Sequence, residues 1–276
     1  MGTVEPVTQP DNDTNAVATR ASIDHTGRVV LVTGGAKGIG RGIAEQYLDA
    51  GATVIACGRN AVDDVPSTSR GTATFMTCDV RDPDAVGSMV DAIVARHGSL
   101  DVVINNAGGS PEADAATASP RFSEAIIRLN LIAPLIVATA ANRVMQQQSS
   151  GGVIVNIASV SAQRPSPGTA AYGAAKAGLV SLTASLAVEW SPLVRLVAIV
   201  CGLIETEQSA LHYGDADGVA AVASTIPLGR MGTPADVGDA CTFASSPLAS
   251  YMSGSTITLH GGGERPAFLG AASDHR

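Results

Sequence analysis

Short runs of apolar, often β-branched residues alternate with longer amphipathic stretches along most of the chain. Such runs predict strands, and the stretches between most of them have the periodicity of helices. Strands that are apolar throughout and separated by helices are typical of a parallel sheet buried on both faces. We therefore expect an α/β protein with a doubly wound parallel sheet of about seven strands. The runs expected to form strands are 29–33, 52–57, 72–78, 101–107, 152–158, 195–201 and 255–260.

The ends of this pattern differ from its middle. Residues 1–24 are rich in Thr, Asp, Asn and Pro and lack apolar periodicity, so we expect a disordered tail before a single domain at 25–276. A Gly- and Ala-rich stretch at about 203–230 interrupts the alternation, and we interpret it as a lid over the substrate. Its Ala, Leu, His212 and Tyr213 content favours a moderately apolar ketone or alcohol.

Composition narrows the classes of function. The net charge of −8 argues against a nucleic acid or an anionic membrane as partner, because both require clustered positive charge. Residues 1–20 lack the apolar core of a signal peptide, and no later stretch reaches spanning length without polar interruption, so we expect a cytoplasmic protein. The four cysteines and five histidines are scattered, which predicts reduced thiols and no metal site.

A glycine-rich turn follows the first predicted strand. The segment TGGAKGIG at 33–40 places Gly34, Gly38 and Gly40 before a helix that extends to about Ala50. Backbone amides in such a turn can approach a pyrophosphate, and the helix N-terminus favours its charge. A turn of this kind can equally serve only to close a tight strand–helix connection.

The end of the second predicted strand bears on the choice of nicotinamide cofactor. An acidic residue at this point accepts hydrogen bonds from the ribose 2′-hydroxyl of NAD. This chain has Cys57-Gly58-Arg59 there, and Lys37 lies in the glycine turn. Two cations are thus available for a 2′-phosphate, which favours NADP (NADPH), with NAD as the alternative. Either cation can instead be an ordinary solvated side chain.

Two residues in AYGAAKAGL at 171–179 are spaced to share one helix face. Tyr172 and Lys176 are four residues apart. A nearby ammonium favours the phenolate of tyrosine, which eases proton exchange with a carbonyl or alcohol. The same spacing occurs in amphipathic surface pairs. Ser159 follows the predicted strand 152–158 directly, where either Ser159 or Ser161 could also be a turn hydroxyl bound to local backbone.

Together these motifs resemble the short-chain dehydrogenase/reductase family. The resemblance extends from about Gly27 to Gly263 and rests on Thr-Gly-x-x-x-Gly-x-Gly at 33–40, NNAG at 105–108, and the spacing of Ser159 from Tyr172 and Lys176. It implies a Rossmann fold and an oxidoreductase that moves hydride between a nicotinamide and a carbonyl or secondary alcohol substrate, with a layout like that of the 3-oxoacyl-thioester reductases. It also implies a homotetramer built through the helices before and around the tyrosine.

The resemblance further implies roles for individual residues. Ser159 and Tyr172 would bind the carbonyl oxygen, Tyr172 would supply the proton, and Lys176 would bind the nicotinamide ribose and lower the pKa of the phenol. Asn130, in RLNLIAP, would hold a water that links the lysine to solvent. The cofactor-binding set that it implies is Gly34, Lys37, Gly38, Ile39, Gly40, Arg59, Asp79, Val80, Asn106, Ala107, Gly108, Tyr172, Lys176, Gly202, Ile204 and Thr206.

Some positions stay open or depart from the family pattern. Asp79 matches the family's adenine contact but could equally cap a helix that starts near Pro83. Asn105 either steadies the sheet, as the resemblance implies, or is a turn residue. Cys201 stands where the family has proline before Gly202, so the following loop lacks a fixed φ. His260 stands where relatives often have Asp, and we assign it no function.

Two other classes of function share parts of this pattern. A non-catalytic dinucleotide-binding sensor or scaffold would keep the glycine turn without needing the reacting groups. A sugar-nucleotide epimerase would share the tyrosine and lysine but usually adds a larger C-terminal region. The presence of Asn130, Ser159, Tyr172 and Lys176 together favours the oxidoreductase.

Overall fold

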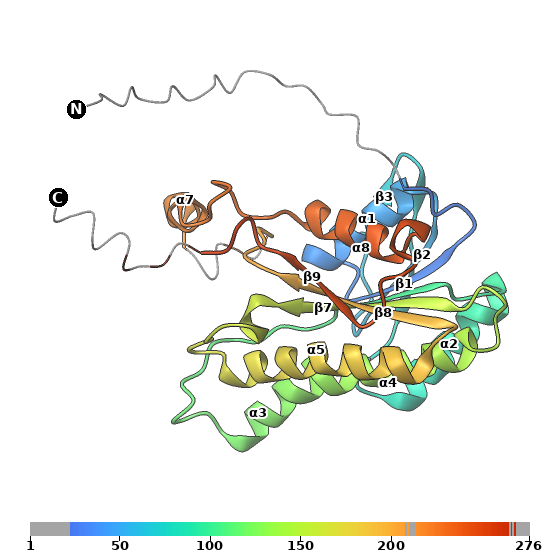
Figure 1. The fold of residues 1–276 in the computed structure, drawn as a ribbon, viewed down its shortest axis with the longest axis horizontal. Coiled ribbons are helices and arrows are strands. Elements are labelled where there is room, and N and C mark those ends of the chain that lie inside the picture. Colours follow the sequence, from blue (N-terminus) through green and yellow to red (C-terminus); the bar gives the residue numbers. More distant parts are fainter. Residues whose placement is uncertain (1–22, 208, 210–213, 265, 267, 269–276) are drawn as a thin grey trace.

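A parallel sheet of seven strands forms the centre of the molecule (Figure 1). The computed structural model describes residues 23–207, 209, 214–264, 266 and 268, so residues 1–22 of the tail predicted at 1–24 and the lid residues His212 and Tyr213 lie outside the described residues. The strand order β5-β2-β1-β6-β7-β8-β9 confirms the predicted doubly wound Rossmann fold. The strands of this sheet are β1 (Val29–Thr33), β2 (Thr53–Gly58), β5 (Thr74–Thr77), β6 (Val102–Asn105), β7 (Gly152–Ser159), β8 (Val194–Cys201) and β9 (Ser255–Leu259).

The third predicted strand is shorter than expected. Residues 72–78 were predicted to form one strand, but β5 begins at Thr74, and a small antiparallel pair precedes it. This pair consists of β3 (Ser67–Thr68) and β4 (Gly71–Thr72). The amide of Ala73 donates to Pro66 O at 2.9 Å, which continues the pairing and keeps the first part of the run out of the main sheet.

Helices cover both faces of the sheet (Figure 1). Successive residues of a strand point to opposite faces, so β1 contributes to two apolar clusters. Val29 and Leu31 pack with α2, α4 and α5, whereas Val30 and Val32 pack with α1 and α8. The helical segments are α1 (Gly38–Asp49), α2 (Pro83–His97), α3 (Pro120–Ile127), η1 (Arg128–Ile132), α4 (Ala133–Met145), η2 (Val160–Ala162), α5 (Ala170–Trp190), α7 (Ala216–Ser224), α8 (Pro234–Ser245) and η3 (Pro247–Ala249).

Small residues let α1 and α8 approach each other closely. A Cβ atom on Gly42 would lie 2.3 Å from Pro234 Cβ, and one on Gly238 would lie 2.5 Å from Gln46 Cγ. Neither position can accept a larger side chain without moving a helix. This contact fixes α1, whose N-terminus closes the glycine turn.

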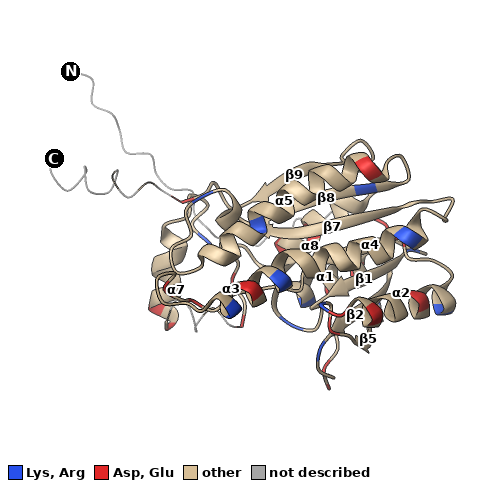
Figure 2. Cartoon of the chain, turned by 90° about the horizontal axis from the view of Figure 1, so that it is seen from below, with Lys and Arg blue, Asp and Glu red and all other residues tan. Residues whose placement is uncertain are grey.

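Two helical stretches are long and apolar enough to cross a membrane by length and composition alone, which differs from the sequence-based expectation. They are Pro120–Met145 and Ala170–Trp190. Core helices of globular proteins meet the same criterion. Here α4 and α5 pack on the sheet, with Val137 and Leu179 at most 1% exposed, and α3 packs on α5. Charged side chains are scattered over the described elements rather than gathered by sign (Figure 2).

Candidate active site

A cavity of about 330 Å³ lies at the carboxyl ends of the central strands, where a doubly wound sheet usually binds its ligand. It brings together the glycine turn, the loop after β6, the end of β7, α5 and the loop after β8. Most of the residues expected to bind cofactor or substrate therefore meet in one place. Those that line it are Gly34, Lys37, Gly38, Ile39, Gly40, Asn106, Ala107, Gly108, Ser159, Tyr172, Lys176, Gly202 and Thr206.

A second cavity of about 350 Å³ continues from the first beside the end of β2. The two share Gly34, Lys37, Ala107 and Gly108, so they form one elongated cleft. Three further predicted residues, Arg59, Asp79 and Val80, line only this second part. Ile204 lines neither cavity and instead forms an isolated bridge with Gly232.

The glycine turn has no room for side chains. Gly34 and Gly38 adopt φ values of 62° and 52°, which residues with a Cβ rarely adopt. A Cβ atom on Gly40 would lie 2.1 Å from Gly34 O and 2.5 Å from Asn106 Nδ2. The backbone of the turn is thus open to a ligand's phosphates, as a dinucleotide requires.

A carboxylate already lies on this turn. The amide of Gly38 donates to Glu207 Oε1 at 3.1 Å, and both residues line the first cavity. The turn therefore accommodates an anionic oxygen at the N-terminus of α1, which supports its fit to a pyrophosphate. Sequence reasoning missed Glu207, because no local pattern links residues so far apart in the chain.

Thr33 joins the glycine turn to the neighbouring strand. Its hydroxyl donates to Ile104 O at 3.1 Å and accepts from the amides of Asn106 and Ala107, each at 3.0 Å. The side-chain Nδ2 of Asn106 in turn donates to Thr33 O at 3.0 Å. The threonine that opens the glycine motif thus holds the two cofactor-facing loops together, a role that the sequence analysis did not assign.

A buried chain of polar side chains crosses the sheet behind the cleft. Asn105 Nδ2 donates to Asn156 Oδ1 at 2.9 Å and to Pro134 O at 3.1 Å. Asn156 Nδ2 donates to Thr183 Oγ1 at 2.9 Å. Each of the three side chains is at most 2% exposed, so these bonds satisfy groups that would otherwise be costly to bury. These hydrogen bonds hold β6, β7 and α5 together. They agree with the interpretation in which Asn105 steadies the sheet.

Lys176 lies deep beside the phenol of Tyr172. Its Nζ is 5.6 Å from the centre of the Tyr172 ring and donates to Ile157 O at 2.8 Å. Burial lowers the pKa of Lys176 to about 8. Burial also raises the pKa of Tyr172, an effect that the neighbouring Ser159 hydroxyl partly offsets. The lowering of the phenol's pKa by lysine, which the family resemblance implied, is therefore not found in this arrangement.

Ser159 has the position of a turn residue and also lies in the cavity wall. Its hydroxyl accepts from the amide of Ser161 at 3.2 Å and so begins η2, as a turn residue would. It also lines the cavity that contains Tyr172. Cys201, the departure from the family's proline, lies at the end of β8 in the same wall, and burial raises the pKa of its thiol to about 12.

Asn130 lies in a short π-helical segment, η1, within an otherwise α-helical stretch. Segments of this kind often occur at functional sites. Its Oδ1 accepts from Gly109 N at 2.9 Å, and its Nδ2 donates to Gly109 O at 2.9 Å and to Ile126 O at 3.0 Å. Asn130 therefore shapes the loop after β6 while lying outside both cavities. A Cβ atom on Gly108 would lie 2.7 Å from Asn130 Oδ1 and 3.3 Å from Lys176 Nζ, so both side chains reach the same face of that glycine.

Asp79 does not cap α2. The cap is Asp82, whose side chain accepts from the amides of Asp84 and Ala85. Asp79 instead accepts from Arg81, with its Oδ2 2.6 Å from Arg81 Nη2, and this guanidinium lowers the pKa of Asp79 to about 2. Of its two expected roles, only the contact with the cofactor is left.

Lys37 and Arg59 are exposed cations on the second part of the cleft. Within the part of the chain that the structure describes, neither forms an ion pair. This distinguishes them from Arg41, which binds Glu45 and Asp64, and from Arg81. Both cations therefore have their donors free for a ligand.

Comparisons with known proteins agree with this geometry. Residues 34–264 match the family model described as enoyl-(acyl carrier protein) reductase. A probable 2,4-dienoyl-CoA reductase of Bacillus subtilis is 34% identical over 85% of this chain and 96% of its own length. The 3-oxoacyl-(acyl-carrier-protein) reductase of Chlamydia muridarum is 33% identical over 85% of this chain and 96% of its own.

A solved structure gives the same result. A short-chain type dehydrogenase/reductase from Mycobacterium marinum superposes with a TM-score of 0.78 at 32% identity, covering 88% of this chain and 98% of that one. With the glycine turn, the tyrosine and the lysine in one cleft, the chain belongs to the short-chain dehydrogenase/reductase family and is an NAD(P)-dependent oxidoreductase that transfers hydride.

Proposed function

We propose that the enzyme interconverts a ketone and a secondary alcohol at Tyr172, using NADP. The observation that carries this proposal is that Ser159, Tyr172 and Lys176 line the same cavity as the glycine turn. A bound nicotinamide supplies or accepts the hydride at the substrate carbon. The protein's own groups must therefore bind the oxygen and move its proton.

Ser159 and Tyr172 are the hydroxyl donors of this site. Two donors aimed at one oxygen stabilise the negative charge that develops on it. Tyr172 then gives the proton during reduction and takes it back during oxidation. Lys176 has three N–H donors and uses one on Ile157 O, so others are left for ribose hydroxyls and for the phenol oxygen. In the proposed cofactor complex, an ammonium brought to the phenol oxygen offsets the rise in the Tyr172 pKa that burial causes and so favours the phenolate form.

Asn130 has a positioning role in this proposal. Its two bonds to Gly109 hold the loop whose Gly108 lies close to both Asn130 and Lys176. A carbonyl oxygen of this kind has a second acceptor position. We assign that position to the water of the proton relay that the family resemblance implies.

The proposed preference for NADP rests on Lys37 and Arg59. Both cations are exposed at the cleft beside the end of β2, where Cys57-Gly58 offers no carboxylate to a ribose. A paired titration with NADPH and NADH, followed by nicotinamide fluorescence, tests this assignment. Clear preference for NADPH is the expected result, and preference for NADH would overturn it.

Tyr172→Phe tests the chemistry. The ring is retained and the hydroxyl is lost, so turnover should fall by about 100-fold or more while NADPH affinity is unchanged. Full turnover by this variant would refute the role of Tyr172. A wild-type chain that binds NADPH but reduces no carbonyl compound would point to the sensor or scaffold, and a change in sugar-nucleotide configuration without net oxidation would point to the epimerase.

The substrate is a carbonyl compound or secondary alcohol of small to medium size. The name of the Chlamydia muridarum relative makes a 3-oxoacyl thioester the first substrate to assay. A simple aliphatic ketone should be assayed beside it, because the fold alone does not select a substrate. We place this reaction in the cytoplasm, without a nucleic acid or membrane partner.

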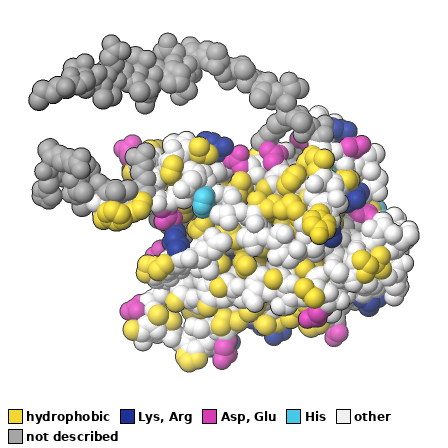
Figure 3. All heavy atoms as spheres, in the orientation of Figure 1, with side chains coloured by type: hydrophobic (Ala, Val, Ile, Leu, Met, Phe, Trp, Pro, Cys, Tyr) yellow, Lys and Arg dark blue, Asp and Glu magenta, His cyan; other side chains and the backbone are white. Residues whose placement is uncertain are grey.

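We also infer a homotetramer. The outer face of α5 carries small uncharged residues and leaves Val188 82% exposed. A second apolar surface surrounds α8 and η3, where Phe243, Leu248 and Tyr251 are 38%, 75% and 103% exposed, and Figure 3 shows apolar side chains over this face. Two distinct apolar surfaces are what a tetramer with two kinds of interface requires.

Molar mass in solution tests the tetramer. Light scattering should give four times the chain mass for the wild type, and Val188→Glu should lower it. A strictly monomeric wild type would refute the inference.

A further inference from the structure

A third cavity, of about 240 Å³, adjoins the reacting groups on the side away from Lys37 and Arg59. It shares Gly202 with the first cavity, and it is lined by Val160, the residue after Ser159. A substrate whose oxygen lies on Ser159 and Tyr172 can therefore extend its remaining atoms into this space. Its lining determines which substrates fit.

The walls of this cavity are of two kinds. Val160, Leu203 and Ile226 form the apolar part. Opposite charges form the polar part, because Arg164 and Glu264 both line the cavity and are joined by an ion pair. The moderately apolar substrate that the sequence predicts would match only the apolar part of the wall and would leave Arg164 and Glu264 without a partner in the substrate.

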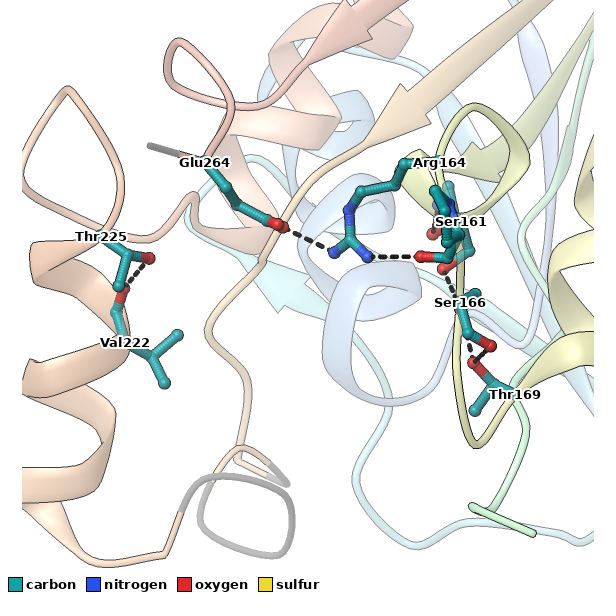
Figure 4. Close-up of polar contacts among 9 residues, drawn as sticks. Ser161, Arg164, Ser166, Thr169, Val222, Thr225 and Glu264 are labelled. Atoms are coloured by element: carbon teal, nitrogen blue, oxygen red, sulfur yellow. Dashed lines mark hydrogen bonds and ion pairs between the residues drawn. The ribbon is translucent and has the colours of Figure 1, made fainter. Parts of the chain in front are cut away.

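The ion pair joins two segments that are far apart in the chain. Arg164 follows η2, and Glu264 follows β9; Figure 4 shows the two side chains pointing toward each other across the space between these segments. Arg164 Nη2 lies 2.6 Å from Glu264 Oε1, and Nη1 donates to Pro165 O at 3.1 Å. Their side chains stay 40% and 39% exposed, so a ligand can reach both.

Two more polar side chains line the same cavity. The side-chain amide of Gln163 forms no hydrogen bond within the described part of the chain, whereas its backbone N–H donates to Val160 O. His260 accepts a weak bond from Gly262 N at its Nδ1, which leaves Nε2 for a ligand.

We propose that the Arg164–Glu264 pair selects substrates that are neutral and carry hydroxyl groups on the chain beyond the reacting carbonyl. This inference rests on the proposed carbonyl reduction and names its substrate class. A hydroxyl both donates and accepts, so one such group can bind the guanidinium and the carboxylate together. The pair, Gln163 and His260 then supply the hydrogen bonds that water would otherwise make to the substrate.

Other substituents match this wall less well. A carboxylate would meet Glu264, and an ammonium would meet Arg164, while the paired charges leave no net attraction for either. An unsubstituted alkyl chain would displace water from the pair without replacing its hydrogen bonds. A hydroxylated chain avoids both penalties.

The test compares 2-hexanone with 5,6-dihydroxy-2-hexanone and with 5-oxohexanoate, using the full chain and NADPH. For the wild type, kcat/KM should be highest for the dihydroxy ketone. Arg164→Gln should lower kcat/KM for the dihydroxy ketone about tenfold, mainly through KM, and change that for 2-hexanone by less than about twofold. Glu264→Gln should lower it for the dihydroxy ketone as well and raise it for 5-oxohexanoate, because the repelling charge is gone.

The matched control is Arg143→Gln, which removes an arginine from an exposed ion pair with Asp91 on the α2–α4 surface. It should leave all three substrates unchanged. Equal losses on 2-hexanone and the dihydroxy ketone in Arg164→Gln, or a wild-type preference for 2-hexanone or 5-oxohexanoate, would overturn the substrate class while leaving carbonyl reduction intact.

Absence of turnover on every ketone would instead count against the proposed function. Calorimetric binding of the dihydroxy ketone to the Tyr172→Phe protein with NADPH then decides the inference separately. Binding that weakens in Tyr172→Phe/Arg164→Gln supports the pair's role, and unchanged or absent binding refutes it.

Discussion

The dinucleotide end of the cleft and the proposed substrate end differ in the chemical groups that form their walls. At the dinucleotide end, backbone groups and short polar side chains form the surface: Thr33 and Asn106 join β1 to β6, and Gly40 leaves the backbone without a covering side chain. At the substrate end, the wall is an exposed ion pair between two loops. A substitution in the glycine turn displaces backbone that faces the cofactor, whereas substitutions at the exposed Arg164 and Glu264 can change the substrate without displacing that backbone. The comparison suggests why one family can keep a reaction while changing its substrates.

The largest expected effect comes from breaking the dinucleotide end at Gly40. In Gly40→Ala the new Cβ would lie 2.1 Å from Gly34 O, so the turn must open. Dinucleotide affinity should fall about 100-fold, because small displacements of positioned groups can cause losses of this size. Gly87→Ala is the control, because its Cβ would meet nothing within 4 Å on α2; it should bind normally and unfold at a slightly higher temperature. Normal NADPH binding by Gly40→Ala would contradict the bare-backbone description.

Arg59→Gln breaks the same end through a side chain. Loss of one charge-assisted bond to the 2′-phosphate should weaken NADPH binding about tenfold and leave NADH binding unchanged. Fluorescence titration with both cofactors measures the ratio. Arg143→Gln, with the same change of charge far from the cleft, should leave the ratio as it is. Equal weakening of NADPH and NADH would show that Arg59 does not contact the 2′-phosphate.

Loss of the Lys176 proton should appear in the pH dependence of kcat/KM. Because burial lowers the pKa of Lys176 to about 8, its ammonium is present below pH 8 and is lost above it. The kcat/KM for carbonyl reduction should therefore be level below this pH and fall by up to about tenfold per pH unit above it. Lys176→Arg should remove the break near pH 8, since guanidinium keeps its charge. A wild-type profile that stays level well above pH 8 would argue against a charged lysine in the reaction.

The smallest expected effect is a change in cofactor affinity when Glu207 is replaced. Its carboxylate accepts from Gly38 N, where a pyrophosphate would bind, so it competes with the cofactor and repels it. Glu207→Gln should tighten NADPH and NADH binding alike, by about twofold to fivefold. Glu205→Gln, two residues earlier with its backbone paired to Gly232, should change neither. A gain for NADPH alone would mean that Glu207 acts on the 2′-phosphate instead.

Local spacing made much of the fold and the central site predictable. Strand alternation fixed the sheet, and Tyr172 and Lys176 needed only a helix to share a face. Contacts between distant segments were not predictable: Asn156 under Asn105, Glu207 on Gly38, and Glu264 on Arg164. Asp82 caps α2, whereas Asp79, three residues earlier in the same loop, is paired with Arg81. The sequence alone does not show which of the two carboxylates forms which contact. The Tyr172 pKa depends on burial, which a motif does not contain.

The bonds from the Thr33 hydroxyl also have a consequence for the order of folding. They join residues 71, 73 and 74 positions apart in the chain. During synthesis, the glycine turn emerges long before its partners Asn106 and Ala107, and contacts of such separation form slowly. A nascent chain that ends before β6 has the complete glycine motif but only half of the pocket. We therefore expect the dinucleotide to stabilise only chains in which β1 and β6 are already joined. Its binding then adds to the stability of the folded protein and does not help the glycine turn to form.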